Sequence, residues 1–153
     1  MPWQEIKICV DYRVRSLCVK PYYNHPSGCP NFGKRDNCPP NAPRIKNTID
    51  LNREIYAIWN IFDFKNHCNK IREKHLNWSQ RQIECCLWWQ PTARKQLKKI
   101  IKDFQKIFPN LKVIELPEAQ GVDLTEIMKS IGIKLEYPPK NITYQIVLAG
   151  HGK

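Results

Sequence analysis

The sequence lacks any long run of apolar residues. Its longest uninterrupted runs span only a few residues, as in Ile146 to Ala149, whereas a membrane-spanning helix needs roughly 20 apolar residues. The first five residues, Met-Pro-Trp-Gln-Glu, also lack the charged and apolar regions of a secretory signal peptide. We therefore expect a cytoplasmic protein with no membrane partner.

Acidic residues are scarce relative to basic ones. The 153 residues include 25 Lys and Arg against 14 Asp and Glu, which gives a formal charge of +11. Apolar residues make up 42% of the chain and include five Trp, enough for a hydrophobic core, so wholesale disorder is excluded. This length fits one domain, and we expect residues 1–153 to form a single domain.

Several motifs that would identify a reaction are missing. The sequence contains no Gly-rich phosphate loop, no nucleophile elbow and no His-Glu-x-x-His motif. It also contains no paired Cys/His finger, no RNP-type aromatic motif, no heptads and no internal repeat. Whether the protein is an enzyme stays open, and its function has to be argued from the cysteines and the distribution of charge.

The hydrophobic pattern predicts an α+β (or α/β) fold with a sheet of about four strands and three to four helices. Strands are predicted over residues 5–14, 54–62, 111–116 and 142–148, although residues 54–62 also fit a helix. Residues 18–47 separate the first two strands and contain eight Pro or Gly residues, which favour turns over regular elements. We call this segment the Cys loop.

The same pattern predicts the helices. Asp63 is expected to cap a helix over about 64–75, and Ser79 another that begins near 80. Pro91 is expected to end or kink that second helix, with a long amphipathic helix restarting at Thr92. A short last helix is predicted between Asp123, which forms a capping-box pair with Glu126, and Gly132.

Seven cysteines without an export signal do not indicate a disulfide framework, because cytosolic thiols are kept reduced. Cys9 falls in the first predicted strand and Cys68 in the first predicted helix, where we expect both to pack in the core. His67 and His75 lie beside the apolar stripe of that helix and are interpreted as half-buried side chains rather than ligands.

The three cysteines of the Cys loop differ from these two. Cys18, Cys29 and Cys38 lie in a polar, Pro-rich segment that buries little apolar surface, so something must offset the entropy lost when it is ordered. Three thiolates converging on a metal would do so, because metal-binding energy becomes folding energy. The alternative is a rigid, Pro-rich surface segment without metal.

The spacing favours an iron–sulfur cluster, with a four-iron cluster preferred, over zinc. Structural zinc sites usually use close pairs such as C-x₂₋₄-C, whereas ten and eight residues separate the loop cysteines. A cluster accepts ligands from a long wrapping loop. The fourth ligand is Cys85, Cys86 or His25, with Cys85 favoured over Cys86, and simple packing is the alternative for the adjacent pair. Three thiolates alone would leave one iron open to substrate.

The positive charge is concentrated in residues 65–112, which carry 12 Lys and Arg and three Asp and Glu and include a basic helical segment over residues 65–108. Such a stripe can neutralise the phosphates of a nucleic acid or another polyanion, and the neighbouring aromatic residues can stack on exposed bases. The alternative is an ordinary solvated helix face. The candidate binding residues are Arg94, Lys95, Lys98, Lys99, Lys102 and Lys106, with Trp88, Trp89, Tyr22, Tyr23 and Phe32 for stacking.

One acidic turn is a further candidate. Residues 116–123 join a predicted strand to a helix N-terminus, a place where ligands bind in open α/β sheets. Glu118 is a candidate general base or metal ligand there, and the amides near Gly121 are candidates for holding an anion. The alternative is a structural turn in which Gly121 supplies a positive φ.

These segments together resemble an uncharacterised family of bacterial and archaeal cysteine-rich proteins that are described as predicted metal-binding proteins. The resemblance covers most of the chain and implies metal binding by the loop cysteines, without a known reaction. It is carried by Cys18-Val-Lys-Pro-Tyr, Gly28-Cys29-Pro, Cys38-Pro-Pro, Trp89-Gln-Pro-Thr-Ala-Arg-Lys, Pro117-Glu118-Ala119-x-Gly121-Val122 and Leu135-Glu-Tyr-Pro-Pro.

Overall fold

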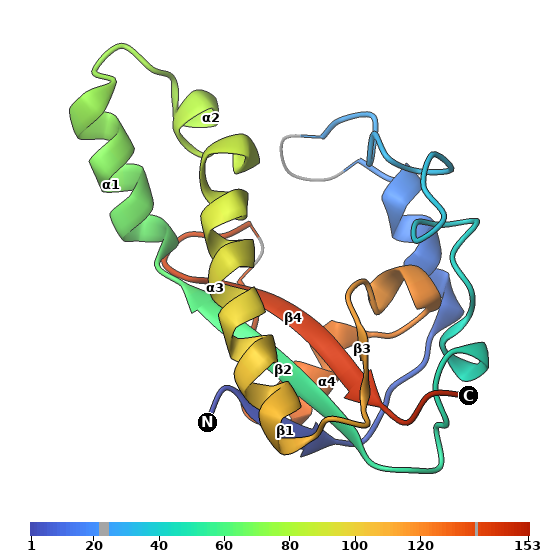
Figure 1. The fold of residues 1–153 in the computed structure, drawn as a ribbon. Coiled ribbons are helices and arrows are strands. Elements are labelled where there is room, and N and C mark those ends of the chain that lie inside the picture. Colours follow the sequence, from blue (N-terminus) through green and yellow to red (C-terminus); the bar gives the residue numbers. More distant parts are fainter. Residues whose placement is uncertain (22–24, 137) are drawn as a thin grey trace.

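An antiparallel sheet lies at the centre of the molecule in the computed structural model, which describes residues 1–21, 25–136 and 138–153 (Figure 1). Its four strands are β1 (Trp3–Ile6), β2 (Ile55–Phe62), β3 (Lys112–Ile114) and β4 (Thr143–Gly150), in the order β1-β2-β4-β3. The two central strands, β2 and β4, pair from Ile55 opposite Gly150 to Phe62 opposite Thr143. The predicted α+β fold with a four-stranded sheet is confirmed.

The helices are α1 (Phe64–Lys74), α2 (Gln80–Ile83), α3 (Cys86–Ile107) and α4 (Leu124–Ser130). Short 3₁₀ helices are η1 (Tyr12–Val19), η2 (Ile45–Asn47) and η3 (Glu118–Gln120). The predicted caps are confirmed: Asp63 accepts a hydrogen bond from the Asn66 amide, and Ser79 forms a capping box with Gln82. Asp123 likewise accepts from the amide of Glu126 at the start of α4.

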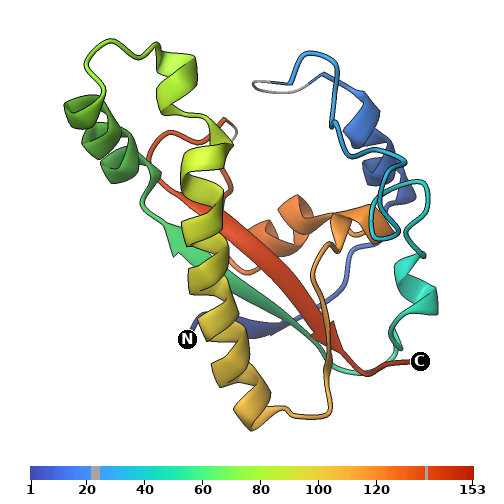
Figure 2. The same ribbon diagram turned by 45° about the horizontal axis from the view of Figure 1, so that its top comes forward.

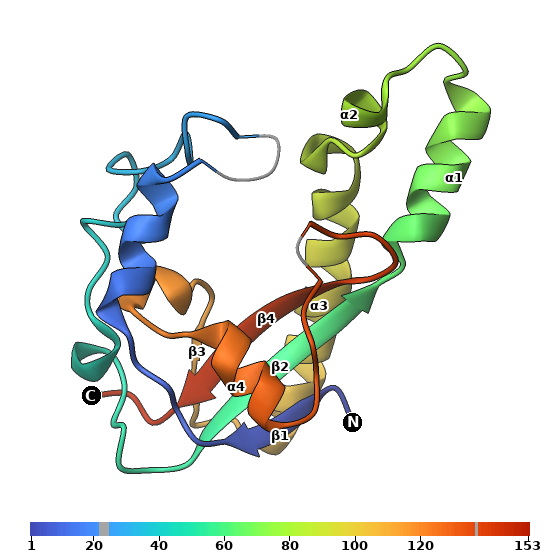
Figure 3. The same ribbon diagram turned by 180° about the vertical axis from the view of Figure 1, so that it is seen from behind.

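Helices cover both faces of the sheet, so the molecule has three layers (Figures 1 and 3). On one face, Leu97 and Phe104 of α3 pack against Ile58 and Val147 of the central strands. On the other face, α4, η2 and the chain around Val122 pack against Ala57, Trp59 and Leu148. Because both faces are covered, β2 is an almost continuous apolar run rather than an alternating one.

Helices α1 and α2 and the start of α3 form a projection that we call the helical arm (residues 64–93). It extends past the end of the sheet, and the Cys loop lies at the same end of the molecule in all three ribbon views (Figures 1, 2 and 3). The arm has its own small core, in which Trp89 stacks on Phe62 and meets Phe64 edge-on.

Two sequence-based expectations about element boundaries are wrong. The first strand ends at Ile6 rather than continuing to residue 14, because the Asp11 side chain accepts a hydrogen bond from the Arg13 amide and starts η1. Pro91 does not break a helix but lies inside α3. Proline has no N–H to donate to the Leu87 carbonyl, but Leu87 is an exposed residue. The helix break falls instead at Glu84 and Cys85, between α2 and α3.

Candidate metal centre

The Cys loop is held by backbone turns and by very few buried side chains. Most of its described residues are exposed, whereas the three cysteines are half-buried. Short-range amide-to-carbonyl bonds such as Cys38 to Arg35 and Ala42 to Cys38 fix the turns. At the C-terminal end of the loop, Ile45 and, just after it, Ile49 anchor the chain in the main core, and both are fully buried. The loop thus has little hydrophobic stabilisation of its own.

The fold brings the backbones of Cys18 and Cys29 together, although ten residues separate them along the chain. The Cys29 amide donates to the Cys18 carbonyl oxygen at 2.6 Å. Burial raises the pKa of the Cys18 thiol, and the neighbouring charges of Cys29, Cys38 and Glu118, together with a side-chain hydrogen bond to Cys29, raise it further. We use the term neighbourhood for Cys18 and the three groups whose charges act on it, namely Cys29, Cys38 and Glu118.

The close approach of the backbone at Cys29 to the backbone at Cys18 depends on Gly28. This residue has a φ of +82°, and a Cβ atom placed on it would lie 2.6 Å from the Cys18 carbonyl oxygen and 3.0 Å from the Val19 carbonyl carbon. Both neighbours are backbone atoms, which cannot move aside as a flexible side chain would. Glycine is required here for its conformation and for space.

Glu118 enters this neighbourhood from η3, between β3 and α4. Contacts between η1 and η3 place it near Cys18. Glu118 is an exposed residue, although protein atoms near its carboxyl group partly desolvate it. This desolvation raises the pKa of Glu118, and the charge of Asp123 adds to the effect.

The position of η3 depends on a tight joint between the N-terminal segment and the turn after η3. The Asp11 amide donates to the Gly121 carbonyl at 2.8 Å, and the Asp123 amide donates to the Cys9 carbonyl at 2.9 Å. Gly121 has a φ of +96°, and a Cβ atom there would lie 2.2 Å from the Tyr12 ring. The predicted positive φ at Gly121 is confirmed, and the joint holds Glu118 opposite the Cys loop.

Cys85 and Cys86 lie at the start of α3 on the helical arm. Cys86 packs against the arm's core, and its pKa is raised by burial and then by Cys85. Cys85 is the N-cap residue of α3. Neither is among the groups whose charges act on Cys18, so the adjacent pair lies outside this neighbourhood.

The remaining candidate ligands pack as expected or fall outside the neighbourhood. Cys68 is buried in the arm's core, and Cys9 packs against the main core. His67 lies against Phe62, and His75 stacks on Trp78 with a centroid separation of 3.7 Å. Within residues 1–21, 25–136 and 138–153, no group of three or more His, Cys, Asp or Glu side chains is arranged to hold a metal ion. The loop thiols are neighbours that do not converge on one point.

The basic residues predicted to bind nucleic acid are all exposed on α3. This exposure fits both an ordinary solvated helix face and a binding face. The residues are Arg94, Lys95, Lys98, Lys99, Lys102 and Lys106. Trp88 is 50% exposed, whereas Trp89 is only 8% exposed. The expectation that Trp89 stacks on bases is wrong, because its ring fills the arm's core. Phe32 is exposed, and Tyr22 and Tyr23 lie outside the described residues.

The sequence interpretation missed a row of aromatic rings on the helical arm. Trp78 stacks with His75, and Trp88 lies 5.4 Å from Trp78 between ring centroids. The three-residue spacing of His75 and Trp78 was visible in the sequence, but the contact with Trp88 requires α3 to fold back beside the end of α1.

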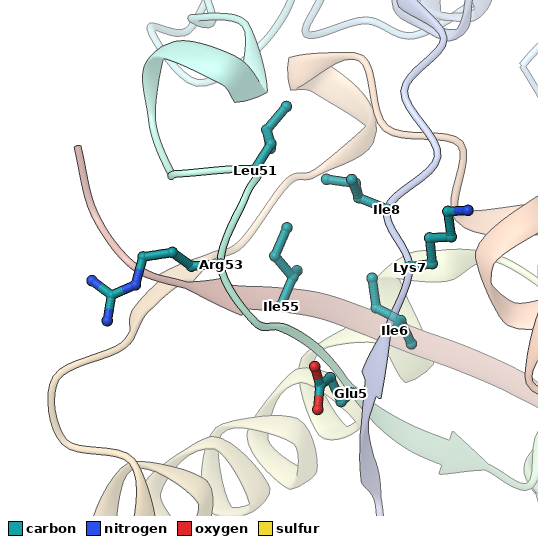
Figure 4. A pocket seen from close by; sticks show the side chains of 7 residues that line it. All are labelled: Glu5, Ile6, Lys7, Ile8, Leu51, Arg53 and Ile55. Atoms are coloured by element: carbon teal, nitrogen blue, oxygen red, sulfur yellow. The ribbon is translucent and has the colours of Figure 1, made fainter.

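A surface cavity of about 560 Å³ lies away from these residues, beside β1. Figure 4 shows Ile6 and Ile8 on one side and Leu51 and Ile55 on the other, while Arg53 points away. Its lining contains no Cys or His, so it offers no soft metal ligand.

No protein-family model, curated protein or solved structure matches this chain. None of the helices in the described part of the chain is both long and apolar enough to cross a membrane.

Proposed function

We propose that this chain is a metal-binding protein in which the thiolates of Cys18, Cys29 and Cys38 hold an iron–sulfur cluster or zinc. The observations that support the proposal are the backbone contact between Cys18 and Cys29 and the effect of the charges of Cys29, Cys38 and Glu118 on the Cys18 thiol. A metal would provide the stabilisation that the loop does not obtain from apolar burial.

The raised pKa of the Cys18 thiol agrees with this proposal. Burial and the neighbouring thiolates and carboxylate oppose its negative charge. A cation at the centre of such a group would reverse that electrostatic cost, because a coordinating thiol is deprotonated by the metal. Binding would draw the three sulfur atoms inward from neighbouring positions, with Gly28 allowing the backbones to stay close.

The wide ligand spacing favours a cluster over zinc, as argued from the sequence. Glu118, whose charge acts on Cys18, is a candidate fourth ligand, and Cys85, Cys86 and His25 remain the other candidates. When bound, a cluster supplies one-electron transfer or, at an iron without a protein ligand, a site for sulfur or redox chemistry. The proposal places the protein in the cytoplasm, where its seven free thiols stay reduced.

The experiment is metal analysis of the full chain purified without chelators, with and without oxygen, together with a visible absorption spectrum. Iron and inorganic sulfide in stoichiometric amounts, with broad visible absorption, would support the cluster. Zinc in the same amount, without colour, would support the zinc site.

Two variants make the test specific. Cys29→Ser removes one proposed ligand and is expected to lose most of the metal, whereas Cys9→Ala removes a thiol outside the neighbourhood and is expected to retain it. If neither variant changes the metal content, or if both lose metal equally, the proposed ligand set is wrong.

A further inference from the structure

One exposed face of α3 combines an aromatic ring with a row of positive charges. Trp88, Lys95, Lys99, Lys102 and Lys106 are separated by seven, four, three and four positions. At 3.6 residues per turn, these spacings place all five within about 40° of one line along the helix. We call this line the basic stripe.

The basic stripe lies opposite the buried side of the helix. Ala93, Leu97 and Phe104, which are at most 8% exposed, face the sheet, so the stripe points away from it. Arg94 and Lys98 flank the stripe and are also exposed. From Trp88 to Lys106 the stripe is roughly 27 Å long, at 1.5 Å per residue.

The charges of the stripe are largely uncompensated. Of the ion pairs formed by the described residues, only the one between Lys106 and Asp103 involves this helix, at 3.4 Å and with both side chains exposed. Exposed pairs of this kind contribute little. Lys95, Lys99 and Lys102 form no ion pair in that part of the chain. Such a row attracts a partner that carries regularly spaced negative charge.

Aromatic rings stand at one end of the stripe. Trp88 is half exposed, and Trp78 lies 5.4 Å away and stacks in turn with His75 at 3.7 Å, with their planes 10° apart. The contact with Trp78 orients the Trp88 ring while leaving half of its surface open. A preorganised, accessible ring of this kind offers a platform on which a flat base can stack.

We propose that the basic stripe binds single-stranded nucleic acid, with phosphates along the lysines and an unpaired base stacked on Trp88. The accessible Trp88 ring beside the lysines favours a single strand over a duplex. In a duplex the bases are already stacked inside and are not accessible to this ring. The length of the stripe suits the short end of the site sizes known for such surfaces, about four nucleotides. This proposal is independent of the metal centre.

The first test is the salt dependence of binding to a fluorescein-labelled oligo(dT) or oligo(U), measured by anisotropy with the full chain. If the four lysines of the stripe contact phosphates, the slope of log K against log salt is expected to be about −2.8, from roughly 0.7 per phosphate for single strands. Affinity should then fall about 50-fold between 50 and 200 mM salt.

The second test uses matched variants. Lys99→Gln combined with Lys102→Gln removes two charges from the stripe and should reduce the slope by about 1.4. The control, Lys129→Gln combined with Lys134→Gln, removes two charges from exposed positions outside α3 and should leave the slope unchanged. Trp88→Ala should weaken binding about 5- to 150-fold, the loss expected for one stacked base. Trp88→Phe, which keeps an aromatic ring, should lose less affinity than Trp88→Ala.

Several results would overturn the proposal. These are equal effects of the two lysine double variants, equal affinity for duplex and single strands with no effect of Trp88→Ala, or binding to phosphatidylserine vesicles or polyglutamate without binding to the oligonucleotides. Metal content, measured in parallel, should be the same in all these variants, so failure here is distinguishable from failure of the metal proposal.

Discussion

Replacing Gly28 by alanine would test how the Cys loop is built. Any side chain at this φ of +82° costs about 1–2 kcal/mol. The added Cβ would also lie 2.6 Å from the Cys18 carbonyl oxygen, so the two segments must separate and the Cys29–Cys18 backbone hydrogen bond is strained or lost. Such a bond contributes about 0.5–1.5 kcal/mol. We expect the loop to lose about 2–3 kcal/mol and the protein to lose most of its metal.

Gly33→Ala is the matched control, because Gly33 lies in the same loop at a φ of +72° with only the Pro40 ring atom Cδ near its added Cβ, at 3.9 Å. It carries the conformational cost of about 1–2 kcal/mol alone and should retain metal. Loop stability is measured by amide hydrogen exchange of residues 25–44, and metal by elemental analysis. Equal metal content in the two variants would refute the claim that close backbone approach at Gly28 positions the thiols.

Three further predictions concern the packing and titration of the fold. Phe104→Ala should lower the free energy of unfolding by about 3–5 kcal/mol in urea titration, because the ring is fully buried, while Ile107→Ala, on an exposed side chain, should change it by less than about 0.5 kcal/mol. Asn60→Ala should cost about 1–3 kcal/mol in the same assay, since its buried amide nitrogen on β2 donates to Ala93 and Gln96 of α3 and to Gln145 of β4. Burial, then the charge of Lys70, lowers the pKa of His67 below its ordinary 6.5. The unfolded chain therefore binds this proton at higher pH than the folded one, and stability should fall as pH drops below about 6.5; His67→Gln should flatten that part of the pH–stability curve, and an unchanged curve would contradict the assignment.

The elements that follow from local chemistry were predictable from the sequence. Asp63, Ser79 and Asp123 cap helices where expected, because capping is a short-range interaction between a side chain and an amide two or three positions later. The central strands β2 and β4 were predicted within about two residues of their observed ends, because long apolar runs bounded by polar residues are typical of buried strands.

The sequence-based predictions that were wrong concern features that depend on contacts between distant segments. The Asp11 side chain starts η1 locally, but the contacts of Val10 with Val122 and of Asp11 with Gly121, in place of a longer β1, are long-range and no local pattern reveals them. The adjacent residues Trp88 and Trp89 have the same chemistry, and only the packing of α3 against Phe62 decides which is buried. That the loop cysteines share a metal stays a prediction, and the effect of the Glu118 charge on Cys18 could be found only from the fold.

The two ends of the Cys loop are attached to the body of the molecule in different ways. Its entrance is tied by the bridge between Val10 and Val122 and by the Asp11 amide on Gly121, and its exit by the fully buried Ile45 and Ile49. Chain between two such fixed points has limited reach even when its own turns are lost. Opening of the segment would therefore be a local event that leaves the sheet folded, and a released ion or cluster could be replaced without refolding of the whole chain.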